Sequence, residues 1–333
     1  MLIFNEQQQR AILGARRVFN ERMVEMERTI GAYVIEGNAL AIPLDAWRRI
    51  DGRTKTLART RLQVFNRLAQ ASTKSIDIAD FVNYYPQASD SGDVTVTMDG
   101  RNDGKADQAV IKFVGTPVPI FRNATRFGWR DMAVIRKGGG QIDTVSFANA
   151  QRKIAEKMED MVLNGLSVVN VSGDTIYGLR NFPLRNTFVH GFTLASATGA
   201  QWLTAFTQAI SAAMGDNQYG QLSIFVNQGD YMRADTTDYA ANYSGTILQR
   251  LRAMGQIKEI IPAASVPANE IIGIVDLDGG EWGDILSAMP LTSRPMARLN
   301  PEDDYVFGNI AACAPQFRSD YAGQSPFVHG TQS

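Results

Sequence analysis

The chain has 333 residues, is 44% hydrophobic and 20% charged, and carries a net charge of −1. These values exclude an intrinsically disordered chain and suit a globular protein of about two lobes. No run of about 18 apolar residues and no signal-peptide pattern occurs, so neither a transmembrane helix nor secretion is predicted. Cys313 is the only cysteine, which excludes an intrachain disulfide and suits a reducing cytoplasm.

The first part of the chain predicts helices with a basic surface. Apolar residues recur at helical spacing over residues 5–30, and a second helix is predicted over 55–72. Residues 1–75 hold 13 Lys and Arg against 7 Asp and Glu. Such a segment suits nucleic acid or an acidic neighbour, although it is equally typical of a solvated helix face. The candidate DNA-facing basic patch consists of Arg48, Arg49, Arg53, Arg59 and Arg61.

Residues 84–130 predict an extended β-hairpin loop. Two strand-like runs, 94–98 and 109–114, flank a turn-rich segment at 99–107. An isolated two-stranded hairpin is only marginally stable in water, so a neighbouring subunit is its natural packing partner. The charges of the tip alternate in sign, which suits either contact with a neighbour or a solvated loop. The tip residues are Asp99, Arg101, Asp103, Lys105 and Asp107.

The most regular helix is predicted at residues 143–165. Asp143 or Thr144 can cap its start, and the Asn164-Gly165 pair can end it. Apolar residues recur along one side at helical spacing, which predicts a buried face. The residues expected in this core are Phe147, Ile154, Met158 and Met161, with Ala150 and Val162 beside them.

An α/β lobe is predicted over 196–290, followed by a β-rich segment over 291–318. The alternation of helical and strand-like runs is what indicates such a lobe. Its expected helices lie at 200–214, 229–236 and 245–254, and its expected strands at 222–227, 257–263 and 270–277.

Few residues suit catalysis. His190 and His329 are the only histidines and neither is near Cys313 in sequence, whereas a nucleophilic site needs a positioned base. The glycines at 138–140 fit a flexible joint better than a phosphate-binding loop. We therefore expect no catalytic residue, metal or cofactor, and no enzyme.

The remote alternative is a metal-dependent α/β enzyme. Carboxylates that lie close together can bind a hard cation, although a solvated acidic loop is the better interpretation of spacing this loose. The acidic cluster over 276–284 consists of Asp276, Asp278, Glu281 and Asp284.

The segments 129–165 and 176–183 resemble the spine of tailed-bacteriophage major capsid proteins of the Hong Kong 97-like superfamily, and of their encapsulin relatives. In that superfamily a strand leads to a loop with an acidic residue. A long helix with Ala-Arg-Lys and Glu-Asp follows, and then a Gly-Leu-x-Asn-x-Pro element. The matching positions are Asp143, Ala150, Arg152, Lys153, Glu159, Asp160, Asn164, Gly165, Gly178, Leu179, Asn181 and Pro183.

The resemblance covers nearly the whole chain and implies an α+β, Hong Kong 97-like capsid fold with two protruding arms. The implied parts are an N-terminal arm with helices (1–83), the extended loop (84–130), the spine helix and peripheral domain (131–195), the axial domain (196–290) and the return to the peripheral domain (291–333).

The resemblance also implies a structural role in a virion. Copies of the chain would assemble as pentamers and hexamers into an icosahedral shell around double-stranded phage DNA, contacted without sequence specificity. The implied setting is a tailed phage of the Caudoviricetes type, assembled in the bacterial host cytoplasm without a membrane. Separate scaffold, portal and decoration proteins are open partners, and the scaffold is either a separate protein or absent. The alternative is an encapsulin-type protein nanocompartment, which shares the fold and encloses protein cargo.

Overall fold

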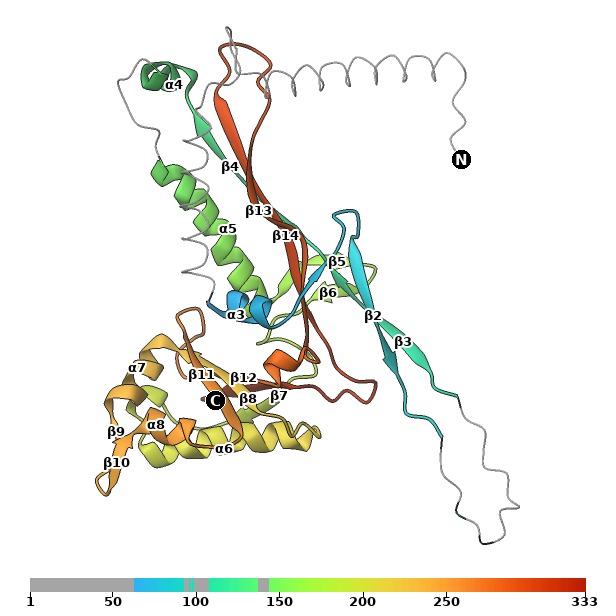
Figure 1. The fold of residues 1–333 in the computed structure, drawn as a ribbon, viewed down its shortest axis with the longest axis vertical. Helices are drawn as coiled ribbons and strands as arrows, with labels where there is room; N and C mark the ends of the chain where they lie inside the picture. Colours follow the sequence, from blue (N-terminus) through green and yellow to red (C-terminus); the bar gives the residue numbers. More distant parts are fainter. Residues whose placement is uncertain (1–62, 93–95, 97, 99–107, 137–143) are drawn as a thin grey trace.

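The computed structural model describes residues 63–92, 96, 98, 108–136 and 144–333. These residues form an elongated lobe, a second lobe at one end of it, and a hairpin that projects from the junction (Figure 1). The hairpin points away from the second lobe, so the described chain has three extensions around one central region.

A four-stranded sheet in the order β1-β13-β14-β4 forms the elongated lobe. Strands β13 and β14 run antiparallel over 13 residues each, which makes this pair the longest ladder described. Short β1 pairs in parallel with the start of β13, and β4 pairs antiparallel with β14. The bounds are β1 Thr73–Ser75, β4 Ile120–Phe127, β13 Gly283–Pro295 and β14 Tyr305–Phe317.

Helix α5 covers one face of this sheet and spans Thr144–Asn164, which confirms the helix predicted at 143–165. Its apolar stripe faces the sheet and the core below it. Gly165 ends the helix with a φ of +71°, a conformation that glycine adopts without strain. Helix α4, Trp129–Arg136, lies between β4 and α5. The predicted cap Asp143 lies outside the described residues.

The projecting hairpin consists of β2, Val82–Ala88, and β3, Ile111–Pro117, with Tyr85 opposite Val114. Of the strand predicted at 94–98 the structure describes only Val96 and Met98, and for these two residues the prediction is wrong, because neither lies in a strand. Their side chains are 90% and 106% exposed. An alternating sequence forms a ladder where one of its faces has something to pack against, and neither the Val96 nor the Met98 side chain is buried. The second predicted run, 109–114, overlaps β3.

The second lobe contains a five-stranded sheet in the order β11-β8-β12-β15-β7. The strands predicted at 222–227 and 257–263 are confirmed as β8 and β11. The helix predicted at 245–254 is shorter in the structure than predicted and spans Ile247–Arg252. The strands are β7 Asn186–Val189, β8 Leu222–Asn227, β11 Ile257–Ala263, β12 Ile271–Val275 and β15 Phe327–Thr331. The helices are α6 Gly199–Gly215, α7 Gln228–Thr236 and α8 Ile247–Arg252, with short η1 Leu194–Ser196 and η2 Leu277–Gly279.

Two small two-stranded ladders complete the described elements. One is β5 with β6, directly after α5, and the other is β9 with β10, at the outer end of the second lobe. Their bounds are β5 Leu166–Val171, β6 Asp174–Ile176, β9 Asp238–Ala240 and β10 Tyr243–Thr246.

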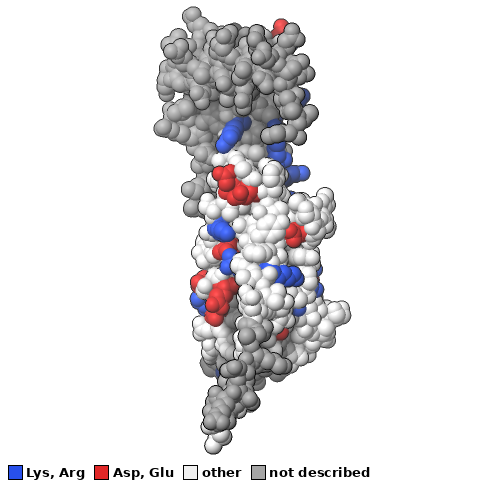
Figure 2. Space-filling model, turned by 90° about the vertical axis from the view of Figure 1, so that its right-hand side faces the viewer, with Lys and Arg blue, Asp and Glu red and all other residues white. Residues whose placement is uncertain are grey.

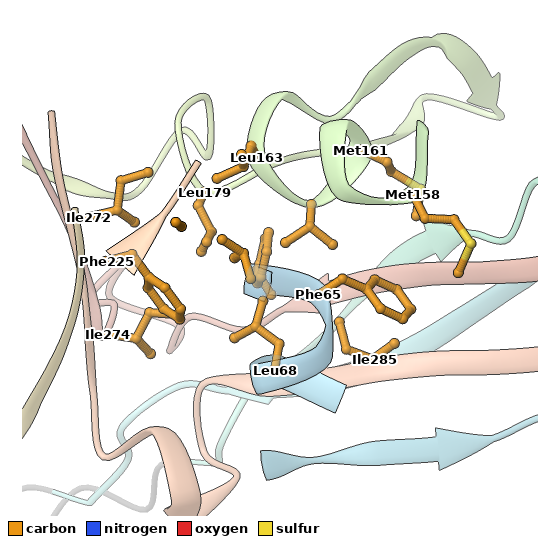
Figure 3. Close-up of a cluster of buried hydrophobic side chains, with 14 of the residues drawn as sticks. Phe65, Leu68, Met158, Met161, Leu163, Leu179, Phe225, Ile272, Ile274 and Ile285 are labelled. Carbon is orange, nitrogen blue, oxygen red and sulfur yellow. The ribbon is translucent and has the colours of Figure 1, made fainter. Parts of the chain in front are cut away.

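The five-stranded sheet is shared by two hydrophobic cores. Alternate residues of β8 point to opposite faces, so Phe225 enters the core beneath α5 while Ile224 enters the core beneath α6. Figure 3 shows the first of these cores, where Phe65 and Leu68 of helix α3 (Gln63–Ala71) meet residues of α5, β8, β12 and β13. The two lobes therefore share one layer of structure and are not joined by a bare linker.

Candidate subunit-contact surfaces

The inner face of the β2–β3 hairpin is fixed to the body of its own chain. Tyr85, Gln87 and Thr116 are buried. The Gln87 Nε2 donates to the Ser319 carbonyl oxygen at 2.9 Å, and the Asn83 Nδ2 donates to the Gln316 Oε1 at 2.9 Å. Paired polar groups of this kind hold an extension in one orientation, because leaving any of them unpaired in a buried site costs about 1–3 kcal/mol.

The opposite face of the hairpin is covered only at its base. Gly115 of β3 lies so close to the Asp174 carboxylate of β6 that a side chain at position 115 would overlap it. Tyr84, the partner of Gly115 in the ladder, is 52% exposed. The base of the hairpin is thus packed between the end of β14 and the β5–β6 ladder.

Beyond its base, this outer face is apolar and open. Phe113 is 64% exposed and Ile111 is 59% exposed. Their ladder partners Pro86 and Ala88 are also exposed, so one continuous face carries these four side chains and Tyr84. We call these five residues the outer hairpin face. Contiguous exposed apolar surface on a projecting element is typical of an interaction site.

A groove runs beside the hairpin. It has a volume of about 410 Å³ and lies between β3 and the segment that follows β6. Phe113, Tyr177 and Leu184 are among its apolar lining residues, with Lys112 and Asp174 at its edges. Residues of both hairpin faces line this groove, Phe113 from the outer face and Gln87 and Lys112 from the inner one.

The core predicted on the long helix is present in the structure: Phe147, Ile154, Met158 and Met161 are buried. The loop-tip residues Asp99, Arg101, Asp103, Lys105 and Asp107 lie outside the described residues, as do the basic-patch residues Arg48, Arg49, Arg53, Arg59 and Arg61. Both of these sites stay predictions.

Sequence reasoning missed the contact between α5 and the start of α3. Glu159 is only 4% exposed, and its carboxylate accepts the backbone N–H groups of Val64 and Phe65 at 3.0 Å each. The Ser265 hydroxyl donates to the same carboxylate at 2.6 Å. The first turn of a helix leaves backbone N–H groups without intrahelical partners, and a carboxylate is a strong acceptor for them. Glu159 thereby anchors the segment through which residues 1–62 join the body.

A second missed network lies where the two lobes meet. The Arg180 guanidinium makes a two-point contact with the Glu270 carboxylate, with both N–O distances 2.7 Å. His329 Nε2 lies 3.1 Å from the same carboxylate, and Arg185 Nε donates to His329 Nδ1 at 3.3 Å. Burial opposes ionisation of Glu270, but the hydrogen bonds from His329 and Arg180 outweigh it and lower its pKa to about 2.

The acidic cluster does not form one site. Asp278 contacts Arg67 at 2.8 Å and Lys258 at 2.5 Å, and hydrogen bonds from these two cations lower its pKa to about 2. Asp284 instead pairs with Arg318 and Ser72. Among residues 63–92, 96, 98, 108–136 and 144–333, no group of three or more His, Cys, Asp or Glu is arranged to hold a metal ion. These two carboxylates are ion-paired, and Asp276, Asp278 and Glu281 are exposed, as expected of a solvated acidic loop.

The remaining candidate catalytic residues, His190 and Cys313, lie in different parts of the fold. His190 Nε2 lies 3.1 Å from the Asn269 carbonyl oxygen, and Cys313 is a buried free thiol in a different strand layer. Burial raises the pKa of Cys313 to about 12, so the thiolate is not formed near neutral pH. In the described part of the chain, no helix is long and apolar enough to cross a membrane.

Charge on the surface is mixed on the face seen in Figure 2, where Lys and Arg side chains alternate with Asp and Glu side chains between broad uncharged areas. Uncharged surface between small charged groups is a composition that protein–protein interfaces commonly have. No single sign of charge dominates the described part of that face.

The chain matches one protein family and is similar in fold to many solved structures. The family model described as "Family of unknown function (DUF6260)" matches residues 37–330. No curated protein matches the chain. A virus-like particle from Pyrococcus furiosus gives a TM-score of 0.60 at 11% identity, covering 85% of this chain and 98% of that chain.

Two phage structures are similar to a comparable degree. The capsid of Myoviridae phage XM1 gives a TM-score of 0.57 at 12% identity, covering 79% of this chain and 90% of that one. A structure of Mycobacterium phage Bobi gives a TM-score of 0.56 at 12% identity, covering 80% of this chain and 89% of that one. The fold is therefore α+β and Hong Kong 97-like, as the sequence predicted.

Proposed function

We propose that this chain, which belongs to the family of unknown function DUF6260, is a capsid-type subunit that builds a closed shell from many copies of itself. The observation that carries this proposal is the outer hairpin face. It projects from the body, is apolar, and is held in a fixed orientation by buried hydrogen bonds at its base.

A fixed apolar projection favours association. Because the hairpin base is already ordered by Gln87 and Asn83, binding by its outer face costs little additional conformational entropy. Burying Phe113 and Ile111 against another subunit would remove two large apolar side chains from water, at about 1.5–3 kcal/mol each when burial is complete. The same surface is present on every copy, so the simplest partner is the chain itself.

The similar folds support this proposal. The Pyrococcus furiosus chain, which belongs to a virus-like particle, is covered over 98% of its length, and the phage XM1 capsid chain over 90%. The present chain thus contains nearly all of the structure that those subunits contain. For the phage type of shell we propose pentamers and hexamers in an icosahedral capsid of a virion, enclosing double-stranded DNA and assembled in a bacterial cytoplasm.

The second candidate is a compartment of the encapsulin type. Its support is that the particle from Pyrococcus furiosus gives a TM-score of 0.60 and is covered more completely than the phage chains above. The two candidates differ in contents, since a phage capsid holds a long nucleic acid and a compartment holds protein cargo. Nuclease-treated particles separate them: recovery of long DNA favours the first, and a stoichiometric cargo protein favours the second.

The test of the proposed function is the size of the purified protein. Mass photometry and negative-stain electron microscopy should show rings or closed particles of many copies. A Phe113→Ser, Ile111→Ser variant should keep the subunit melting curve and lose these particles. Lys153→Ser is the control, because Lys153 is exposed on α5 and belongs neither to the hairpin nor to the groove beside it. Parent protein that stays a monomer or dimer, with any co-expressed scaffold present, would contradict the proposal.

A further inference from the structure

The four-stranded sheet has one buried face and one open face. On the buried face, Asn123 Nδ2 donates to the Ala150 carbonyl oxygen of α5 at 3.3 Å, and the Phe307 ring lies 6.3 Å from the Phe147 ring. Side chains alternate between the faces of a sheet, so the sequence neighbours of Asn123 and Phe307 point away from α5. On that other face Arg122 and Ala124 are exposed.

The open face carries three arginines, which we call the arginine face: Arg122, Arg126 and Arg294. All three are exposed, and the Arg126 side chain is 74% exposed. In the ladder Arg294 is opposite Gly308, and Gly308 is opposite Ala124. On this face the Met296 side chain lies beside Gly308, and its Sδ is 3.8 Å from the Arg122 guanidinium, so an exposed methionine sits among the arginines.

The connection from β13 to β14 forms an acidic tip next to this face, made of Leu299, Glu302, Asp303 and Asp304. The Asp303 carboxylate accepts the backbone N–H groups of Leu299 at 3.1 Å and Asn300 at 2.7 Å, which fixes the turn. Leu299 is 90% exposed at the end of this turn, and Glu302 is exposed beside it. The tip therefore presents one exposed apolar side chain and three carboxylates, while the neighbouring Arg298 guanidinium lies over the Tyr305 ring.

We propose that the acidic tip of one copy docks on the arginine face of a second copy. This inference rests on the proposed shell function and specifies one of its contacts. The charges are complementary, and exposed Leu299 on the tip and exposed Met296 on the arginine face offer an apolar contact between them. Complementary charge of this kind selects the partner and its orientation more than it adds affinity.

Nucleic acid is the other ligand that three arginines suit, and the neighbouring acids disfavour it. Asp304 lies 3.9 Å from Arg126 in the same chain, so the acidic tip adjoins the arginine face. A phosphate backbone that approached the arginines would meet these carboxylates, whose charge repels it. The acidic tip and the arginine face are different surfaces, so their contact is heterologous and closes into a ring when the rotation between copies permits.

The test uses two single charge reversals, Glu302→Arg and Arg294→Glu, in the full chain. Each variant alone should give at least about tenfold fewer closed particles than the parent, because it places like charges in the contact. Mixing the two variants should restore particles, since the reversed tip of one then meets the reversed face of the other. Rescue by mixing requires contact between different chains and does not follow from a change within one subunit.

Matched controls carry the same reversals elsewhere. Glu281→Arg and Arg233→Glu change exposed residues outside the tip and the face, and particle yield should equal that of the parent. Variants that assemble like the parent, or a mixture without rescue, overturn this contact while the shell function stands. Parent protein without any particles overturns both. If Arg294→Glu leaves particle yield unchanged but abolishes a gel shift with a short DNA duplex, the arginine face binds nucleic acid and the inference is wrong.

Discussion

The buried carboxylate of Glu159 accepts the backbone N–H of Phe65 at 3.0 Å, across 94 positions of sequence. Phe65 itself packs into the core that α5 and β13 share (Figure 3). Glu159 of α5 thus fixes the start of α3, and with it how deeply the Phe65 side chain is buried in the core.

Glu159→Gln tests that anchor. The amide has one carbonyl oxygen in place of two carboxylate oxygens and no charge, so the three donors around it lose part of their hydrogen bonding. We expect the free energy of unfolding to fall by about 1–3 kcal/mol. Urea denaturation of the subunit measures this loss, and amide hydrogen exchange should rise in residues 63–71. Glu156→Gln is the control, because its exposed pair with Arg152 is worth at most about 0.5 kcal/mol. Equal effects of the two changes would refute the anchor.

Ile154→Asp tests the packing of α5 on its core. Ile154 is 4% exposed, and an aspartate there would be a buried charge without a partner. We expect a loss of several kcal/mol, on the order of 3–5, or insoluble protein. Lys153→Asp, one position away on the exposed side, should change stability by less than about 0.5 kcal/mol. Soluble particles of normal heat stability from Ile154→Asp would show that the helix faces another way.

The acid stability of the chain should depend on Glu270. Its pKa is lowered to about 2 in the folded state, from an ordinary value of 4.5. A carboxylate with a lowered pKa adds stability above its unfolded pKa, and that stability is lost as the pH falls through the folded value. We expect this contribution, on the order of 3 kcal/mol at most, to disappear between about pH 4.5 and about pH 2.

Glu270→Gln should flatten the decline in urea midpoint over this pH window, because the variant has no proton to bind there. Glu281→Gln, which changes an exposed carboxylate, should keep the slope of the parent. If the urea midpoint of Glu270→Gln falls with pH as steeply as that of the parent, other carboxylates account for the acid sensitivity. The pair of Glu270 with Arg180 is then not the source of that sensitivity.

The tip of the extended loop is a separate prediction. Residues 99–107 alternate in charge, and a loop that only turned the chain would need no more than Asn-Gly. Replacing them with Asn-Gly should leave the melting curve of the subunit unchanged and should prevent shells or make them fragile. Electron microscopy of heated particles measures the outcome. Equally heat-stable shells from the shortened protein would show that the loop is merely solvated.

The sequence predicts the elements with strong periodicity. Helix α5 and strands β8 and β11 match their predicted ranges because each has a continuous apolar pattern and clear end signals. The strand at 94–98 failed because alternation alone does not say whether anything packs on a strand. The Glu159 and Arg180 contacts join positions 94 or 95 and 90 residues apart, and no local pattern marks a long-range pair.

Strand β15 lies between β12 and β7, although it follows both of them in the sequence. During translation the five-stranded sheet therefore has a gap in its middle until residues 327–331 have left the ribosome. Until then β7 has no neighbour to pair with, and Phe327 and Val328 are missing from the two cores that meet at this sheet. The order of synthesis thus delays completion of the second lobe, and of both cores that meet at its sheet, until β15 has been made.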